Sequence, residues 1–326
     1  MYFGYMETDS LQEKYDLQAQ MLANRVKKRF KHLHKRFARK NLDIFRLYDW
    51  DIPEIRAVVD WYAGHLVIGE YSRKQSTPNW LPLMGRSVAQ ALSVPEDKLH
   101  LKIRRAGIKE GTRYRRISHV NQKIPMAEGD LRFLINPTDY VDTGLFSDHR
   151  NTRRMIRERA LGKSFLNLYC YTGSFTCYAA KGGAARTVSV DRSETAIQWV
   201  RENMELNGLW GSEHTLIQQD TLDFLSLHPT AEPGFDLAVV DPPSYSTTRV
   251  TGKHFDIAKD HPGMLNGVFE RMKPGGTVFF STNHQSFEMK TGELSVTGIT
   301  EITSKTIPED YISKRKQIHR AWEITV

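Results

Sequence analysis

Asn167-Leu-Tyr-Cys-Tyr-Thr-Gly-Ser-Phe-Thr176 is the first of four short segments that decide the fold of this 326-residue chain. The other three are Val188-Ser-Val-Asp191, Ile217-Gln-Gln-Asp220 and Ala238-Val-Val-Asp-Pro-Pro-Ser-Tyr245. Each is an apolar or β-branched run that ends in a glycine turn or an acid, and a helical pattern follows three of them. This pattern is typical of a parallel sheet whose strand carboxyl ends line a ligand crevice.

The same alternation of strand and helix patterns continues to the end of the sequence. Helical patterns run from Ser174 to Lys181 and from Glu194 to Asn207, where Gly208 stops the second one. A long loop is expected from Pro242 to Phe255. Five β-α units and a closing hairpin predict an α/β fold with a seven-stranded Rossmann-like sheet. The expected strands are 164–170, 186–190, 214–218, 235–240, 277–281, 299–306 and 319–326.

A basic helical arm is predicted for residues 1–42. One helix is expected over 10–41, with nine Lys and Arg and no acid between Gln20 and Lys40. An apolar stripe runs along the same helix at steps of three or four residues. Two interpretations stay open: a docked helix with a solvated basic face, or an arm that contacts phosphates. The stripe consists of Leu22, Val26, Phe30, Leu33 and Phe37.

Residues 43–140 predict a small α+β domain, and residues 141–326 then form the α/β domain. The small domain has a strand pattern at 45–48, a hairpin over 57–71, a helix over 83–92 and strands at 99–103 and 131–135. Nothing in it looks catalytic. Its basic loop, which includes Arg104, Arg105, Lys109, Arg113, Arg115 and Arg116, favours a role in binding or positioning a nucleic acid.

The composition is that of an ordinary soluble globular protein, with 40% hydrophobic and 26% charged residues. No window approaches the length of a membrane span, and the first residues lack the pattern of a secretory signal. Two cysteines, Cys170 and Cys177, make a disulfide framework unexpected and suit a reducing cytoplasm. The formal net charge of +8 favours a polyanionic partner.

The glycine turn and the acids suit a nucleoside ligand. Gly173 lets the backbone approach a ligand, and the helix after it offers free N–H groups. The segment is not Gly-x-Gly-x-x-Gly, which argues against a nicotinamide oxidoreductase. Asp191 could accept hydrogen bonds from ribose hydroxyls, and Asp220 from an adenine amino group. Each acid alone is more often a helix N-cap, but three acids at successive strand ends, counting Asp241, favour a shared site.

Asp241-Pro-Pro-Ser-Tyr245 is the most specific signal in the sequence. Pro242 and Pro243 fix the backbone and remove two N–H donors, which leaves carbonyl groups exposed in a rigid geometry. The Asp241 side chain and a proline carbonyl can accept hydrogen bonds from a base edge, and Tyr245 can stack on the base. The alternative is a simple turn at the end of a strand.

These motifs together resemble the class I S-adenosylmethionine-dependent methyltransferases. More narrowly, the chain resembles the guanine-N7 methyltransferases of 23S ribosomal RNA, which form the carboxyl-terminal half of a bifunctional bacterial enzyme. The upstream half of that enzyme is not in this sequence. The resemblance rests on Arg46-Leu-Tyr-Asp-Trp-Asp-Ile-Pro53, Asp142-Thr-Gly-Leu-Phe-Ser-Asp-His-Arg150, Asn167-Leu-Tyr-Cys-Tyr-Thr-Gly-Ser-Phe175, Asp241-Pro-Pro-Ser-Tyr-Ser246, Phe280-Ser-Thr-Asn283 and Arg315-Lys-Gln-Ile-His-Arg-Ala-Trp322.

The resemblance implies S-adenosylmethionine as cofactor, 23S rRNA or a pre-ribosomal particle as partner, and a cytoplasmic location. We expect no resident metal, because no metal-ligand spacing is present. Asp241, Pro242, Pro243 and Tyr245 are the expected catalytic residues. The segment before the helix at 151–161 is expected to strap over the cofactor, although it could simply cap that helix. The expected cofactor residues are Thr143, His149, Arg150, Tyr171, Thr172, Gly173, Ser174, Phe175, Asp191, Arg192, Asp220, Thr221 and Asp241.

The target atom can be argued from chemistry. Methylation of a pyrimidine C5 needs a cysteine thiolate, and Ser281-Thr-Asn-His284 stands where related enzymes carry that cysteine. Guanine N7 needs no general base, because its lone pair is already nucleophilic and no proton is lost. An exocyclic amine such as adenine N6 is the nearest alternative. A non-catalytic RNA-binding assembly protein on the same scaffold is a further alternative.

Overall fold

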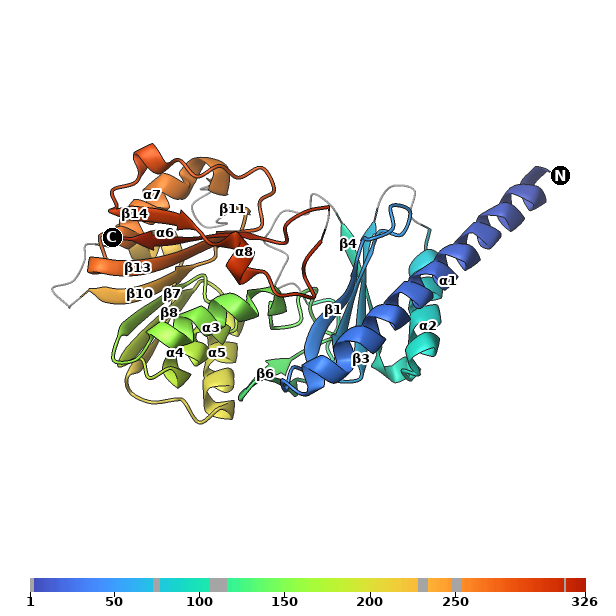
Figure 1. The fold of residues 1–326 in the computed structure, drawn as a ribbon, viewed down its shortest axis with the longest axis horizontal. Helices are drawn as coiled ribbons and strands as arrows, with labels where there is room; N and C mark the ends of the chain where they lie inside the picture. Colours follow the sequence, from blue (N-terminus) through green and yellow to red (C-terminus); the bar gives the residue numbers. More distant parts are fainter. Residues whose placement is uncertain (1–2, 73–76, 106–115, 228–233, 248–253, 314) are drawn as a thin grey trace.

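The computed structural model describes residues 3–72, 77–105, 116–227, 234–247, 254–313 and 315–326. Figure 1 shows a larger α/β unit beside a smaller unit, with the amino-terminal part of the first helix projecting beyond the smaller unit. No helix in the described ranges is long and apolar enough to cross a membrane. Three of the basic residues noted in the sequence lie outside these ranges: Lys109, Arg113 and Arg115.

The larger unit is built on a seven-stranded sheet, which confirms the predicted Rossmann-like fold. Five strands pair in parallel, and β15 pairs antiparallel with both β13 and β14. The strand order is β14 (Gly298–Glu301), β15 (Arg320–Thr325), β13 (Met272–Thr282), β10 (Phe235–Val240), β7 (Ser164–Leu168), β8 (Arg186–Asp191) and β9 (His214–Gln218).

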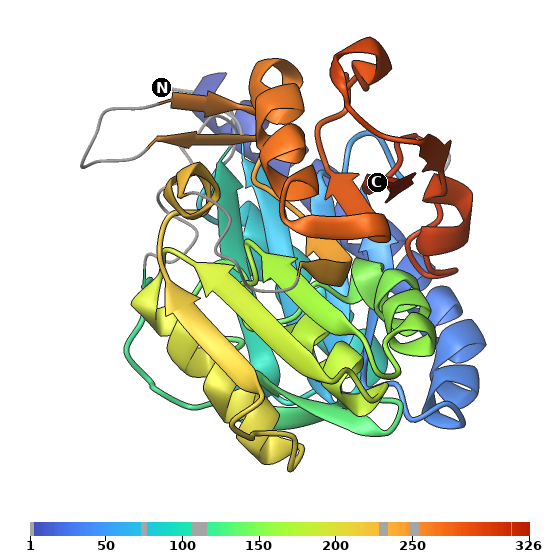
Figure 2. The same cartoon turned by 90° about the vertical axis from the view of Figure 1, so that its left-hand side faces the viewer.

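Helices flank both faces of this sheet (Figure 2). Successive strand residues point to opposite faces, so Leu166 and Val240 pack with α7 (Ile257–Phe269), on whose side α6 (Thr221–Ser226) also lies. Phe165 and Val239 pack on the other face with α3 (Arg150–Arg159) and α4 (Ser174–Lys181). Helix α5 (Glu194–Leu206) lies next to α4. Burial on both faces explains why these strands read as continuous apolar runs.

The register of the parallel strands places their carboxyl ends at one edge. Leu168 pairs with Val240 and with Val190, and Val240 pairs with Phe280. The residues that follow these positions are the glycine turn, Asp191, the Asp-Pro-Pro motif and Ser281. All four segments therefore leave the sheet at the same edge.

The smaller unit has a four-stranded sheet in the order β1 (Ile44–Asp49), β2 (Ala57–Tyr62), β3 (His65–Ser72), β4 (Leu99–Arg105). Helix α2 (Trp80–Leu92) connects the parallel strands β3 and β4. Helix α1 (Phe3–Ala38) packs against α2 and β1. Four residues of its apolar stripe are buried: Leu22, Val26, Leu33 and Phe37. The docked interpretation of the helix is therefore correct for its apolar face, while most of its basic residues are exposed.

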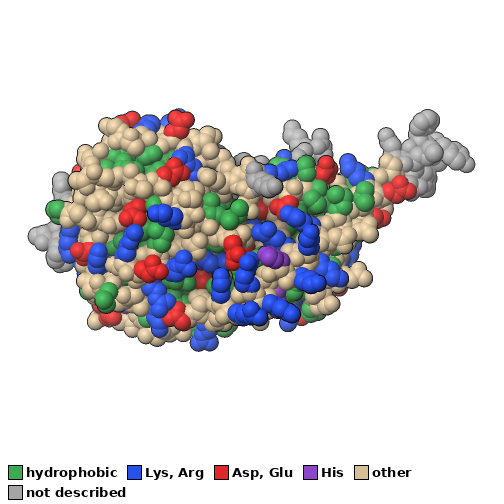
Figure 3. Space-filling model, in the orientation of Figure 1, with side chains coloured by type: hydrophobic (Ala, Val, Ile, Leu, Met, Phe, Trp, Pro, Cys, Tyr) green, Lys and Arg blue, Asp and Glu red, His purple; other side chains and the backbone are tan. Residues whose placement is uncertain are grey.

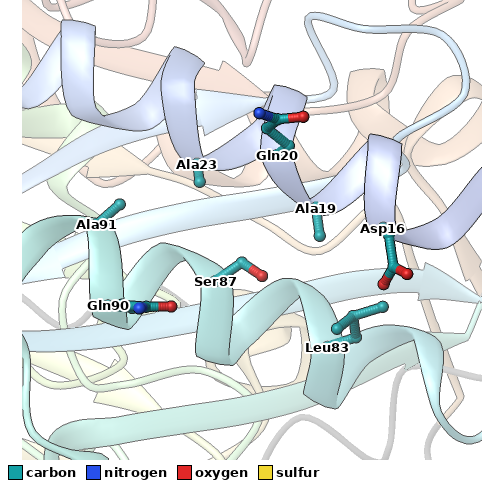
Figure 4. Close-up of a pocket in the computed structure, with 8 residues that line it drawn as sticks. All are labelled: Asp16, Ala19, Gln20, Ala23, Leu83, Ser87, Gln90 and Ala91. Carbon is teal, nitrogen blue, oxygen red and sulfur yellow. The ribbon is translucent and has the colours of Figure 1, made fainter. Parts of the chain in front are cut away.

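Small side chains let α1 and α2 lie close together (Figure 4). Ala19 and Ala23 of α1 face Ser87 and Ala91 of α2 across a shallow pocket of about 310 Å³. The pocket is formed by these two helices alone, so it is a feature of helix packing in the smaller unit.

The hairpin of β5 (Ile124–Glu128) and β6 (Leu131–Ile135) differs from expectation. We predicted the second strand within the small sheet and did not predict the first. Met126 and Phe133 pack in one cluster with Cys177 and Val200 of α4 and α5 and with Ile44 and Tyr62 of the small sheet. The hairpin therefore lies between the two units, and the predicted boundaries at residues 42 and 140 stay predictions.

Two further segments differ from the sequence prediction. The strand expected over 299–306 ends at Glu301, and Thr303–Thr306 forms the short helix α8. Thr303 Oγ1 accepts the N–H of Ala321 at 3.0 Å, a side-chain contact that replaces a strand pairing here. The loop expected after Pro242 contains the short strands β11 (Tyr245–Thr247) and β12 (His254–Asp256).

Candidate active site

The turn between β7 and α4 requires glycine at position 173. Gly173 has a φ of +75°, and a Cβ added there would lie 2.5 Å from Val200 Cγ1. Tyr169 and Tyr171 also have positive φ, at 58° and 49°. Three left-handed residues within five are strained for residues other than glycine, and such strain is concentrated at ligand sites.

Asp191 lies against this glycine turn. Its carboxylate accepts the backbone N–H of Tyr171 at 3.0 Å and that of Ser193 at 2.9 Å. The side chain is buried, whereas the neighbouring Arg192 is exposed. A carboxylate oxygen can accept more than one hydrogen bond. A buried carboxylate at this strand end therefore suits donors such as a pair of ribose hydroxyls.

Asp220 and Thr221 lie one strand farther along the same edge. Asp220 caps α6 and accepts the N–H of Leu222 at 3.0 Å, while Thr221 is buried. The capping role that the sequence left open for Asp220 is therefore present. Its second carboxylate oxygen has the acceptor capacity that an adenine amino group would need.

Residues 143–150, named the strap here, lie over the glycine turn. Thr172 Oγ1 donates to the carbonyl of Gly144 at 2.6 Å, and the ring of Phe146 lies 5.1 Å from that of Tyr171. Thr143 Oγ1 is 2.8 Å from the hydroxyl of Tyr62 in the smaller unit. The strap therefore connects the smaller unit to the candidate cofactor turn.

Arg150 is the predicted cofactor residue that the structure does not bring to this turn. Its guanidinium donates to both oxygens of Asp310 at 3.1 Å and to the carbonyl of Ile44 at 2.9 Å. Burial raises the pKa of Asp310, and the charge of Arg150 opposes that rise. A buried bidentate pair of this kind fixes the start of α3, so Arg150 has a structural role.

Arg153 has the contacts to the turn that Arg150 lacks. It donates to the carbonyl of Phe146 at 2.8 Å and lies 3.5 Å from Ser174 Oγ. A fully buried bidentate pair with Glu128 holds it in place. Nothing in the sequence indicates this role, because Arg153 is one of five arginines in a short helix and only the fold shows which of them contact the turn.

The Asp-Pro-Pro motif begins directly after β10. Asp241 Oδ1 accepts a hydrogen bond from Ser281 Oγ at 2.6 Å, and Oδ2 lies 3.6 Å from His149 Nε2. Pro242 is buried, Pro243 is partly exposed, and the side chain of Tyr245 is 53% exposed. One wall of the site is therefore rigid and acidic, and it ends in an accessible aromatic ring.

His149 belongs to a buried cluster with Asp148 and His319. The two imidazole rings stack at 4.3 Å with planes 10° apart, and His319 Nδ1 lies 3.1 Å from Asp148 Oδ2. Burial lowers the pKa of His149 despite the facing carboxylate of Asp241. Burial opposes the charge on Asp148, but His149 and His319 outweigh it and hold the pKa of that carboxyl well below its usual range. Asp148, Ser281 and His319 were not among the expected catalytic or cofactor residues. Ser281 and His319 reach the site from a distant part of the chain, whereas Asp148 lies within the strap.

The same cluster is the one group of possible metal ligands within the described residues. A nitrogen lone pair lies in the plane of its imidazole ring. Two nearly parallel stacked rings therefore direct their lone pairs within two separate, nearly parallel planes, which is unfavourable for binding one shared ion. The geometry suits a packed hydrogen-bonding cluster beside Asp241.

Neither cysteine is activated as a nucleophile. Burial raises the pKa of the Cys170 thiol well above its ordinary value, and it raises that of Cys177 to about 12. Thiolate is the reactive form, so both thiols are inert at neutral pH. The site therefore lacks the nucleophile that covalent methylation of a pyrimidine C5 requires.

Comparisons with known proteins bear on the family and the fold of this chain. The sequence model of a family described as S-adenosylmethionine-dependent methyltransferase matches residues 53–291. A solved structure of a candidate methyltransferase in complex with SAH, 20% identical, superposes with a TM-score of 0.74 over 95% of this chain and 82% of that one. At this identity the likeness concerns the fold.

Curated relatives are longer than this chain. The Vibrio cholerae protein named ribosomal RNA large subunit methyltransferase K/L is 38% identical over 311 residues, which is 93% of this chain and 43% of that protein. The Aeromonas hydrophila protein of the same name is 39% identical over 315 residues, or 94% and 43%. The chain thus spans less than half the length of these relatives.

Proposed function

Because the chain belongs to the S-adenosylmethionine-dependent methyltransferase family, we propose that it methylates N7 of a guanine in bacterial 23S ribosomal RNA. One observation carries the proposal. The glycine turn, Asp191 and the Asp-Pro-Pro motif leave neighbouring parallel strands at a single edge, because Leu168, Val190 and Val240 occupy one row of the sheet. A cofactor on the turn and a base on the motif would then lie side by side.

The residues at this edge fit S-adenosylmethionine. Val200 closes the space beside Gly173, so the turn can approach a ligand only with its bare backbone. As acceptors, the carboxylate of Asp191 suits ribose hydroxyls, and that of Asp220 suits an adenine amino group. When bound, the cofactor supplies an electrophilic methyl group on a sulfonium. The residues of this chain bind it, orient it and cover it with the strap.

The base would be held by the motif and need not lose a proton. Asp241, fixed by Ser281, and the carbonyl groups beside the two prolines are acceptors in a rigid frame. Tyr245 offers an accessible ring for stacking. Guanine N7 then requires only alignment with the methyl group, which is a proximity effect. The inert cysteines weigh against the pyrimidine C5 alternative.

The basic face of α1 supports an RNA substrate. Figure 3 shows Lys and Arg side chains gathered over the carboxyl-terminal half of α1. Lys27, Lys31 and Lys35 are exposed there. Phosphate contacts by such lysines provide affinity without sequence preference. The names of the relatives point to large-subunit rRNA. We therefore propose that the substrate is naked rRNA or a pre-ribosomal particle in the cytoplasm.

The test is methyl transfer in vitro from labelled cofactor to 23S rRNA and to pre-ribosomal large subunits. Nucleoside mass spectrometry and fragment mapping then identify the product. We expect 7-methylguanosine at one position with the wild-type protein and none with Asp241→Ala. Methylated adenine would favour the exocyclic-amine alternative, and the absence of any labelled nucleoside from both substrates would refute the proposal.

A further inference from the structure

The end of β13 contacts the Asp-Pro-Pro-Ser-Tyr motif through three successive polar pairs. Ser281 Oγ donates to Asp241 Oδ1 at 2.6 Å. Ser244 Oγ donates to Asn283 Oδ1 at 2.6 Å. The hydroxyl of Tyr245 lies 3.0 Å from His284 Nε2. Three polar side chains of the motif thus each contact a residue of the neighbouring segment.

The pairs continue the register of the sheet beyond its strands. Val240 of β10 pairs with Phe280 of β13, an offset of 40 residues. The three contacts beyond that pair have offsets of 40, 39 and 39 residues. The segments that follow β10 and β13 therefore leave the sheet side by side. Beyond the last backbone pair, they are connected by contacts between side chains.

The imidazole of His284 forms its side-chain hydrogen bond with Tyr245. The imidazole meets the phenol ring edge to face at 5.7 Å. Its Nδ1 is buried and has no hydrogen-bond partner among the described residues. Tyr245 is therefore the hydrogen-bond partner of this ring within the described part of the chain.

We propose that His284 is a positioning residue, which fixes the ring of Tyr245 at the angle at which it stacks on the target base, and that Asn283 supports it by holding Ser244. This inference rests on the proposed function, since it assigns Tyr245 to the base. His284 acts through the tyrosine and touches neither the cofactor nor the reacting atoms. Its effect should therefore appear in the alignment of the base, which governs kcat, more than in cofactor binding.

A first experiment tests the contact without any activity. In ¹⁵N-labelled protein, we expect Tyr245→Phe to shift the Nε2 resonance of His284 and to leave that of the exposed His119 in place. An unchanged His284 resonance would overturn the proposal. This result is independent of methyl transfer, so a wild-type protein that is inactive on rRNA would refute the proposed function and leave this test to decide the contact.

A second experiment measures kcat and the KM values for rRNA and cofactor in a set of variants. We expect His284→Phe to lower kcat roughly three- to tenfold, the size of one net hydrogen bond. Tyr245→Phe should match it, and the double variant should be no slower than either. His284→Gln, which keeps a hydrogen-bonding group, should recover most of the loss. Ser286→Ala, an exposed neighbour, is the control.

Additive losses in the double variant would show that the two side chains act separately, and would overturn the proposal. So would a loss confined to the KM for the cofactor. A thermal melt of each variant checks folding, and His284→Gln keeps the test decisive if His284→Phe is unstable.

Discussion

The carboxylate of Asp191 accepts the backbone N–H of Tyr171 at 3.0 Å, and so ties the end of β8 to the glycine turn that follows β7. The same carboxylate holds the N–H of Ser193 at the start of α5. One side chain therefore fixes three segments around the candidate cofactor site. The turn contains left-handed residues that need such support.

Asp191→Asn should weaken both the fold and cofactor binding. An amide presents one acceptor oxygen, so one of the two backbone N–H groups would face an NH₂ group. We expect the free energy of unfolding to fall by about 1–3 kcal/mol, the cost of an unsatisfied buried donor. Urea unfolding and calorimetry with S-adenosylmethionine would measure the two effects. The exposed Asp223→Asn is the control, and unchanged cofactor affinity in Asp191→Asn would exclude it from the ribose site.

Gly173→Ala should be more damaging than Gly208→Ala. Both glycines have positive φ, at 75° and 63°. An added Cβ meets Val200 at 2.5 Å in the first case and nothing within 4 Å in the second. The difference between the two variants thus isolates the clash from the backbone strain. We expect Gly173→Ala to lose about 1–3 kcal/mol more stability in urea, and equal losses would contradict the packing argument.

The sheet was predictable because its signals are local. Apolar runs that end in Gly173, Asp191 and Asp241 define strands and turns, and parallel pairing then brings their ends together. The docking of α1 also followed from its stripe of Leu22 and Val26. Local patterns were therefore sufficient for the sheet and for one wall of the site.

The parts that could not be predicted depend on long-range contacts. Arg150 and Arg153 lie on one helix and look alike in the sequence, yet their partners Asp310 and Glu128 come from opposite directions along the chain. The short strand that ends at Glu301 is limited by the contact of Thr303 with a residue 18 positions later. No periodicity contains such information.

Arg150→Ala should mainly reduce stability. It leaves Asp310 buried without its charge partner, which costs about 3–5 kcal/mol. Arg154→Ala, which breaks an exposed pair with Glu158, should cost no more than about 1 kcal/mol. Urea unfolding measures both. A large loss of cofactor affinity in Arg150→Ala, with stability unchanged, would contradict the structural role and indicate that Arg150 contacts the cofactor.

Acid should destabilise the protein between about pH 6.5 and pH 4. Burial, with the nearby His65 and Lys102, lowers the pKa of His100 from 6.5 to about 4. The unfolded chain therefore binds more protons in this window, so the free energy of unfolding falls as the pH falls. Burial also lowers the pKa of His149 and His214. Urea titrations across this range should show a shallower slope for His100→Gln, and an unchanged slope would contradict its burial as a neutral ring.

RNA binding should depend steeply on salt through α1. The triple variant Lys27→Ala/Lys31→Ala/Lys35→Ala should bind rRNA more weakly, and the slope of log Kd against log salt should decrease by about one per lost phosphate contact. Lys163→Ala/Lys181→Ala is the matched control, because these exposed lysines lie at the start of β7 and the end of α4, away from the strand carboxyl ends. An equal decrease in both would contradict a specific role for α1.

The strand β15 lies between β13 and β14, although it follows both of them in the sequence. The sheet can therefore be completed only late in synthesis. Residues 320–325 are synthesised after the other strands of this sheet. Until then, the place between β13 and β14 that β15 occupies in the finished sheet is unfilled. His319, which precedes that last strand, also reaches its stacked place on His149 only at this stage. A nascent chain would therefore carry the Asp-Pro-Pro motif before the cluster beside Asp241 is complete.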